Sequence, residues 1–130
     1  MPESCPCGSG GSYAECCEPF HTHATSPRTA EQLMRARYSA FALADGDYLL
    51  ETWYPGTCPR KIVLEGNLEW TGLEILHTEG GSAFEAAGVV EFAATYMVHK
   101  RRRSVPGRLH EVSRFVCEDM VWYYLDGRTR

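Results

Sequence analysis

Four of the six cysteines crowd into the first seventeen residues, in the stretch CPCGSGGSYAECC. A Cys-x-Cys turn rich in glycine is separated by eight residues from an adjacent cysteine pair. Four thiolates gathered in this way match the tetrahedral sulfur coordination that Zn²⁺ adopts in structural sites. Four protein ligands also close the coordination sphere, so no position is left for water or substrate. The spacing therefore predicts one structural zinc ion bound by Cys5, Cys7, Cys16 and Cys17.

Disulfide bonding is the main alternative use of these thiols. Adjacent cysteines do not bridge each other easily, and a pair two residues apart forms only a strained ring, so disulfides would need crossed or longer-range pairing. The adjacent pair leaves a second alternative open, because neighbouring side chains usually diverge. His21 or His23 could then supply the fourth ligand in place of one cysteine. We expect the all-cysteine set.

Composition places this segment in the context of an ordinary globular chain. The 130 residues are 44% hydrophobic and 23% charged, which predicts one domain with a small appendage. The formal charge of −4 argues against a general nucleic-acid-binding protein. No apolar run approaches the length of a membrane span, and Glu3 and cysteines stand where a signal peptide would carry basic and apolar segments. We expect a cytoplasmic protein, in which clustered cysteines are more often metal ligands than disulfides.

The elements that follow the cysteines begin with helices. Residues 25–29 supply a loop and a helix cap, and residues 30–44 place apolar side chains at helical spacing. Asp47 is expected to cap a second, short helix that reaches Trp53 and is ended by the proline behind it. These helices precede every strand of the expected sheet.

From residue 67 onward the hydrophobic period changes to two, and Val, Phe, Tyr and Trp become frequent. Helices followed by a meander of strands predict an α+β fold with an antiparallel sheet. The basic run at 100–103 is expected to be a solvated hairpin loop rather than a phosphate-binding patch. The four expected strands are 68–77, 87–98, 109–117 and 120–125.

The last two strands are close enough in sequence to be placed in register. A two-residue turn at Glu118-Asp119 would put Cys117 opposite Met120 and Phe115 opposite Trp122. Residues opposite each other share a face of the sheet. Neither face of this pair is cleanly polar, so we expect that both are partly covered or that one lines a cavity.

The stretch CPCGSGGSYAECC resembles the SEC-C motif, a small zinc-binding module. The segments LMRARYSAFALADGDYLLETWYPGT, LEWTGLEI, VEFAATY, HEVSRF and VWYYLDG resemble, in that order, the YchJ-type family of bacterial proteins. The resemblance implies a SEC-C knuckle at residues 1–24 and an NTF2-like, or cystatin-like, α+β domain at 25–130, with helices packed on a curved sheet of about four strands. It also implies a single zinc ion. The family name implies no reaction, and Gly11 stands where the motif usually has Lys.

Because NTF2-like domains resemble cones that enclose a pocket, the resemblance also directs attention to polar residues that could line one. His110 with Glu91 could transfer a proton if both lay within hydrogen-bond reach in an apolar pocket. A cross-strand ion pair between a Glu and an Arg, with a solvated or satisfied His, is the simpler interpretation. No nucleophile elbow, phosphate loop or paired-carboxylate motif supports catalysis. The candidate pocket residues are Tyr38, Trp53, Glu91, His110, Glu111, Ser113, Arg114 and Tyr124.

Two classes of function follow from these observations. The first is a zinc-containing interaction or adaptor protein that uses the knuckle to bind a protein partner, with nucleic acid as a less favoured partner. The second is a small enzyme or ligand-binding protein that uses the pocket. Residues 1–20 contain almost no aliphatic side chains, so their order should depend on metal, whereas residues 30–126 should fold without it.

Overall fold

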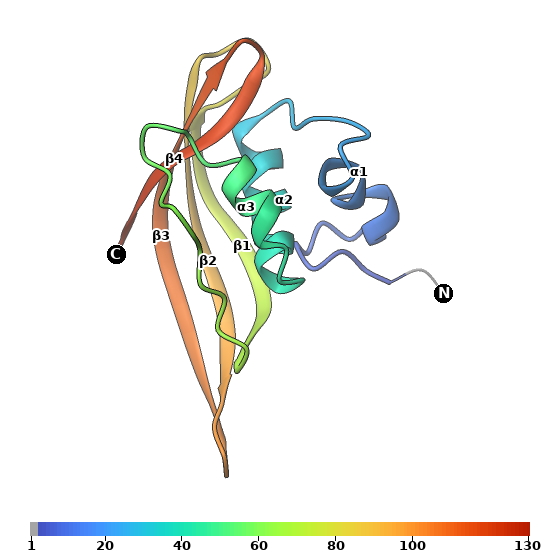
Figure 1. Ribbon diagram of the computed structural model, residues 1–130, viewed down its shortest axis with the longest axis vertical. Helices are drawn as coiled ribbons and strands as arrows, with labels where there is room; N and C mark the ends of the chain where they lie inside the picture. Colours follow the sequence, from blue (N-terminus) through green and yellow to red (C-terminus); the bar gives the residue numbers. More distant parts are fainter. Residues whose placement is uncertain (1–2) are drawn as a thin grey trace.

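A computed structural model of the protein, which describes residues 3–130, shows three layers (Figure 1). A curved sheet forms one side, two helices form the middle, and the amino-terminal knuckle lies on the far side of the helices from the sheet (Figure 1). The knuckle carries the 3₁₀ helix η1 (Tyr13–Glu15) and α1 (Glu18–His21). The other elements are α2 (Ala30–Ala42), α3 (Gly46–Glu51), β1 (Leu68–Gly80), β2 (Ala87–His99), β3 (Ser104–Glu118) and β4 (Val121–Thr129).

Helix α2 begins and ends through local hydrogen bonds that its sequence supplies. Thr29 caps it, because its side chain accepts a hydrogen bond from the backbone N–H of Gln32. At the other end Ala44 adopts φ 60°, and the N–H of Asp45 donates to the carbonyl of Ala40 at 2.8 Å. This is the pattern of a Schellman motif, in which a left-handed residue stops the helix. The helix therefore ends two residues before the predicted limit of 44.

The short helix α3 has a different cap from the predicted one. Asp45, rather than Asp47, accepts the hydrogen bond from the backbone of Tyr48. Asp47 lies inside the first turn, where a carboxylate is also favourable because of the helix dipole. The helix ends at Glu51, before Trp53, because residues 52–54 pair with the edge strand β4 instead.

The sheet is an antiparallel meander in the order β1-β2-β3-β4, as predicted. Every strand ends later than predicted, and β4 begins one residue later than predicted. The basic residues 100–103 form the exposed connection between β2 and β3. The predicted register of β3 and β4 is wrong by two positions. The turn residues are Asp119 and Met120, both with positive φ, and Cys117 pairs with Trp122. A type I′ turn requires this conformation at both central residues, and its twist matches that of the strands.

The error of two positions leaves the faces unchanged near the turn, because the side-chain period of a strand is two. Phe115 pairs with Tyr124, so these residues still share a face with Trp122 and Cys117. Further from the turn an irregularity between Arg114 and Phe115 exchanges the faces of β4. As a result Asp126 lies beside Arg114 on the outer face, rather than opposite Glu111 as predicted.

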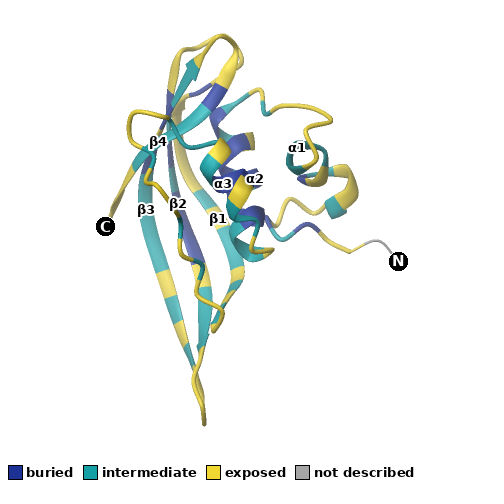
Figure 2. Cartoon of the chain, in the orientation of Figure 1, coloured by how far each residue is buried: buried dark blue, intermediate teal, exposed yellow. Residues whose placement is uncertain are grey.

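Helix α2 is buried on two sides, because it is packed between the sheet and the knuckle (Figure 2). Tyr38 and Phe41 pack against Trp70 of the sheet, whereas Ala36 and Ser39, both fully buried, contact the knuckle. The buried cluster runs without interruption from Phe115 in the sheet to Cys5 and Cys17 in the knuckle. Among the helices of residues 3–130, none is long and apolar enough to span a membrane.

Candidate metal centre and cavity

The four amino-terminal cysteines converge on one point. Their Sγ atoms all lie within 4.8 Å of one another. The Sγ of Cys16 is 3.6 Å from that of Cys7 and 3.9 Å from that of Cys17. Zinc–sulfur bonds of about 2.3 Å in a tetrahedron imply sulfur–sulfur distances of about 3.8 Å. The cluster therefore has the size and chemistry of a site that could hold a metal ion.

Local backbone structure explains how an adjacent cysteine pair can face one point. The N–H of Cys5 donates to the carbonyl of Gly11, and Gly8 and Gly10 have positive φ, so the segment turns tightly back on itself. Cys16 follows η1 with φ −109° and ψ −87°, and Cys17 begins α1 with φ −91° and ψ −21°. This change of backbone conformation between neighbours allows both sulfur atoms to reach the cluster.

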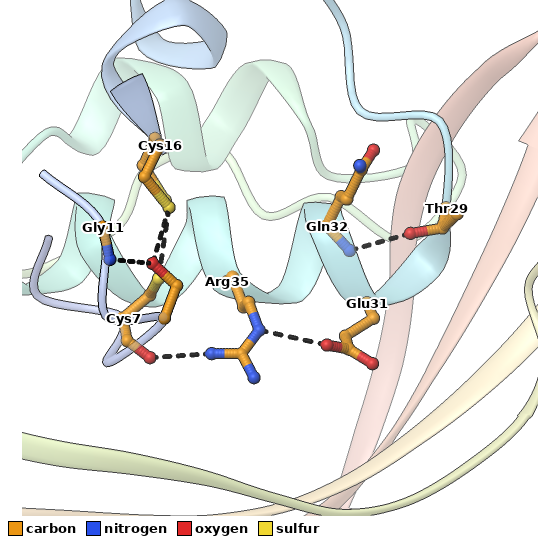
Figure 3. A network of polar contacts seen from close by, with 9 residues as sticks. Cys7, Gly11, Cys16, Thr29, Glu31, Gln32 and Arg35 are labelled. Carbon is orange, nitrogen blue, oxygen red and sulfur yellow. Dashed lines mark hydrogen bonds and ion pairs between the residues drawn. The ribbon is translucent and has the colours of Figure 1, made fainter. Parts of the chain in front are cut away.

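Helix α2 holds the cluster through three contacts along one side. The guanidinium of Arg35 donates to the carbonyl of Cys7 at 2.9 Å and is oriented by Glu31 (Figure 3). The hydroxyl of Ser39 lies 3.4 Å from the sulfur of Cys5. The carbonyl of Ala36 accepts a hydrogen bond from the knuckle at 2.8 Å.

The two alternative histidine ligands are engaged elsewhere. His21 Nε2 donates to the carbonyl of Ala36, so Nδ1 is the acceptor for the hydroxyl of Tyr13 at 2.7 Å. Both ring nitrogens of His21 are therefore occupied, and the ring packs edge-on against Tyr48 at 4.7 Å. His23 is exposed and lies 2.6 Å from a carboxylate oxygen of Glu51. Among residues 3–130 the metal-ligating group contains only the four cysteines.

The close packing of the thiols shifts the pKa values of Cys7, Cys16 and Cys17. A hydrogen bond from Cys17 lowers the pKa of Cys7 to about 4, against the effect of burial. The pKa of Cys17 is raised by the same hydrogen bond and by burial, and burial also raises that of Cys16. Crowded sulfur atoms cannot all carry negative charge unless a cation compensates them. The set is thus suited to a divalent metal that favours thiolate ligands.

A second candidate site lies on the other side of α2, against the inner face of the sheet. It is a cavity of about 300 Å³. Five of the sequence-predicted pocket residues line it, namely Tyr38, Trp53, Glu111, Ser113 and Tyr124. Burial raises the pKa of the Glu111 carboxyl and raises that of Tyr124 to about 12.

The other three predicted pocket residues lie outside this cavity, which corrects the sequence prediction. Glu91, His110 and Arg114 alternate with inward-facing residues of β2 and β3, so they occupy the outer face. His110 Nε2 lies 2.6 Å from a Glu91 oxygen, and this contact lowers the pKa of Glu91. Arg114 forms a bidentate ion pair with Asp126. These are cross-strand pairs, the simpler of the two sequence interpretations.

Sequence reasoning missed the residues of α2 that organise both sites. Arg37, only 3% exposed, lines the cavity. The sequence indicated this, because Arg37 stands at helical spacing between the apolar residues Leu33 and Phe41. The sequence also indicated which side of α2 contacts the knuckle. Ala36 and Ser39 are small residues at helical spacing, which permit close approach of a second layer.

Comparison with known proteins agrees with this arrangement. Residues 1–19 match the SEC-C motif, and residues 29–127 match the family described as YchJ, middle NTF2-like domain. The chain belongs to the YchJ family. Its relatives include the UPF0225 protein of Streptomyces coelicolor, 48% identical over 123 residues that cover 95% of this chain and 93% of that protein. The UPF0225 protein of Deinococcus radiodurans is 47% identical over 122 residues, or 94% of this chain and 86% of that one.

Two solved structures share the fold of this YchJ family member. The solution structure of a SEC-C motif containing protein from Rhodopseudomonas palustris has a TM-score of 0.78 and 30% identity, and covers 100% of this chain and 99% of that one. The crystal structure of a SEC-C motif containing protein from Psychrobacter arcticus has a TM-score of 0.70 and 27% identity, with 94% and 80% covered. The sequence-based assignments of family and of an NTF2-like α+β fold are thus confirmed.

Proposed function

We propose that the knuckle holds one structural Zn²⁺ through Cys5, Cys7, Cys16 and Cys17, and that it serves as a protein-interaction module in the cytoplasm. The observation that carries the proposal is the convergence of four sulfur atoms, all within 4.8 Å of one another, which supports a tetrahedral site closed by four thiolates. A site closed by four thiolates has no open position for a reacting group. The metal would therefore hold the shape of a surface, and reduced thiols are normal in the cytoplasm.

The charge of that surface indicates the kind of partner. The first 27 residues contain three glutamates and neither Lys nor Arg. All three, Glu3, Glu15 and Glu18, are exposed. Four thiolates around one divalent cation add a net charge of about −2. The knuckle therefore repels phosphate backbones, and a basic segment of a protein is the complementary partner.

The zinc part of the proposal is tested by metal analysis of protein purified under reducing conditions. We expect about one equivalent of zinc per chain. Cys16→Ser should abolish stoichiometric binding, while Cys58→Ser, which lies outside the cluster, should leave it unchanged. Protein that takes up no zinc when reduced would contradict the proposal.

The partner part is tested by covalent capture from cells with the full chain. The variant Glu15→Lys with Glu18→Lys reverses charge on the knuckle and keeps all four ligands, and Glu65→Lys with Glu85→Lys makes the same change on exposed residues of the NTF2-like domain. Compared with the wild type, we expect recovery of one basic protein to fall at least tenfold with the first variant and to be equal with the second. Recovery should also fall at high salt. Equal recovery with both variants, or capture of RNA in place of protein, would overturn the proposal.

A further inference from the structure

The cavity between α2 and the sheet has an apolar wall and one polar end. Its volume of about 300 Å³ lies at the lower limit of small-molecule sites. Since water occupies about 30 Å³ per molecule in the liquid, this space suits a ligand of about ten non-hydrogen atoms. The apolar wall consists of Met34, Phe41, Trp70, Phe92, Ala94 and Leu109.

The polar end is formed by a buried cation that lacks a counter-ion. Arg37 is 3% exposed, and its NH1 donates to the carbonyl of Leu49 and to the hydroxyl of Thr52, both at 2.7 Å. Within residues 3–130 no carboxylate forms an ion pair with it, and its Nε and NH2 groups donate no hydrogen bond. Burial lowers the pKa of Arg37 to about 10, so it is still charged at neutral pH. Such a charge is costly unless something pairs with it.

Two aromatic rings flank this cation. The Arg37 guanidinium lies 5.3 Å from the centre of the Trp53 ring and 4.5 Å from that of Tyr124. Buried donors are nearly always satisfied, so the unused Nε and NH2 groups of Arg37 beside the cavity indicate a missing acceptor.

The nearest acidic side chain does not supply this acceptor. Glu111 lines the same cavity and attracts Arg37 through space, but within residues 3–130 the two side chains form no ion pair. Burial raises the pKa of its carboxyl, so its charged form is disfavoured there. The cavity therefore offers unused donors on a buried cation.

We propose that this cavity binds a small monocarboxylic acid as its carboxylate, with the anion accepting from the Nε and NH2 groups of Arg37 and an apolar body against Trp70, Phe92 and Leu109. A single cation matches one negative charge better than the two of a phosphate. The planar guanidinium presents two adjacent N–H groups that fit the two oxygens of a carboxylate. This site is separate from the metal centre, because α2 lies between them.

The test is a titration of the full, zinc-loaded protein with phenylacetate and hexanoate, followed by the fluorescence of the two cavity tryptophans. Phenylacetamide serves as the neutral isostere of phenylacetate. We expect saturable binding of at least one acid at millimolar concentration or below, and binding of the amide at least tenfold weaker. The affinity of the acid should fall at least tenfold in Arg37→Met but not in Arg114→Met, which removes an arginine from the outer face.

A second variant keeps the test decisive if Arg37→Met does not fold. Ala94→Leu fills the cavity from β2 without touching the polar end, and it should abolish the titration while the fold persists. Equal affinity for the acid and the amide would overturn the proposal, as would binding that Ala94→Leu leaves unchanged. Failure of both acids to bind would overturn it as well.

Discussion

In the knuckle, the side chains that reach the interior are mainly cysteine sulfurs, whereas in residues 25–130 they are aliphatic and aromatic carbons. Cys5, Cys7 and Cys17 are between 0% and 4% exposed, as are Leu49 and Phe115 in the larger part. Apolar burial stabilises a chain at about 25 cal/mol per Å², and the knuckle has too few carbons to use it. The same depth of burial therefore needs a different source of stability in each region: the hydrophobic effect in the larger one and, under our proposal, metal coordination in the knuckle.

The two regions nevertheless share one helix. Arg35, Ala36 and Ser39 hold the knuckle, and Met34, Arg37 and Tyr38 face the sheet and its cavity. The knuckle is thus a third layer on the domain rather than an arm beside it. This arrangement refines the expectation that the two parts are independent, because loss of one layer must expose part of α2.

Removal of the metal should give the largest effect and tests the comparison directly. We expect a strong chelator, or Cys16→Ser with Cys17→Ser, to disorder residues 3–24, because structural zinc is worth roughly 10–16 kcal/mol to such a segment. The larger domain should keep a cooperative thermal transition. Because it loses its contacts with the knuckle, its free energy of unfolding should fall by roughly 2–3 kcal/mol and its Tm by on the order of 10 °C. Near-UV circular dichroism melts measure this change. Unfolding of the whole chain in one step on chelation would show that the two regions form one cooperative unit.

A substitution in the apolar core should destabilise the larger domain and leave the metal site unchanged. Phe115→Ala removes a side chain that is 1% exposed and should cost about 3–5 kcal/mol in chemical denaturation of the larger domain. Phe84→Ala is a matched control, because that ring is 99% exposed and should change stability by less than about 0.5 kcal/mol. Zinc stoichiometry below the transition should remain unchanged in both variants. Loss of zinc from folded Phe115→Ala would mean that the metal site depends on the sheet.

The contact between the two regions can be weakened without touching either core. Arg35→Met removes the hydrogen bond to the Cys7 carbonyl, and since the side chain is partly exposed we expect a cost of about 1–2 kcal/mol. A chelator should then extract the metal faster than from the wild type. Arg28→Met, an exposed position just before α2, is the control and should behave as the wild type does. Equal extraction rates in the two variants would show that α2 does not hold the cluster.

The smallest expected effect concerns Glu111, a polar side chain in the largely apolar interior of the larger domain. The folded-state pKa of Glu111 is raised above its usual 4.5 by burial, so its contribution to stability is present at acidic pH and lost as pH rises through the folded pKa. Glu111→Gln should remove this loss and make the protein more stable than the wild type at neutral pH, with the difference vanishing in acid. Denaturation at several pH values measures it, with exposed Glu74→Gln as the control. A less stable Glu111→Gln protein at neutral pH would show that the carboxylate supports the fold.

The local sequence determined the elements and the cysteine-rich segment of this protein. Thr29 and the spacing of Leu33, Tyr38 and Phe41 mark helix α2, and period-two patterns mark the four strands. These features depend on hydrogen bonds and side-chain spacing within a few residues, which can be seen in a linear sequence. The grouping of Cys5, Cys7, Cys16 and Cys17 was visible for the same reason.

Only the tertiary structure decided how these elements meet. The β3–β4 register depended on positive φ at Met120, a residue that has no intrinsic preference for it, so packing of the strands selected the turn. The structure places His110 and Glu91 outside the cavity and Arg37 in its lining, which the sequence did not predict. A strand alternates between two faces, and only the packing of α2 shows which face is inside. The contacts of both ring nitrogens of His21, with Tyr13 and with Ala36, likewise became visible only in the tertiary structure. Long-range contacts of this kind depend on which surfaces are buried together, and no short stretch of sequence contains that information.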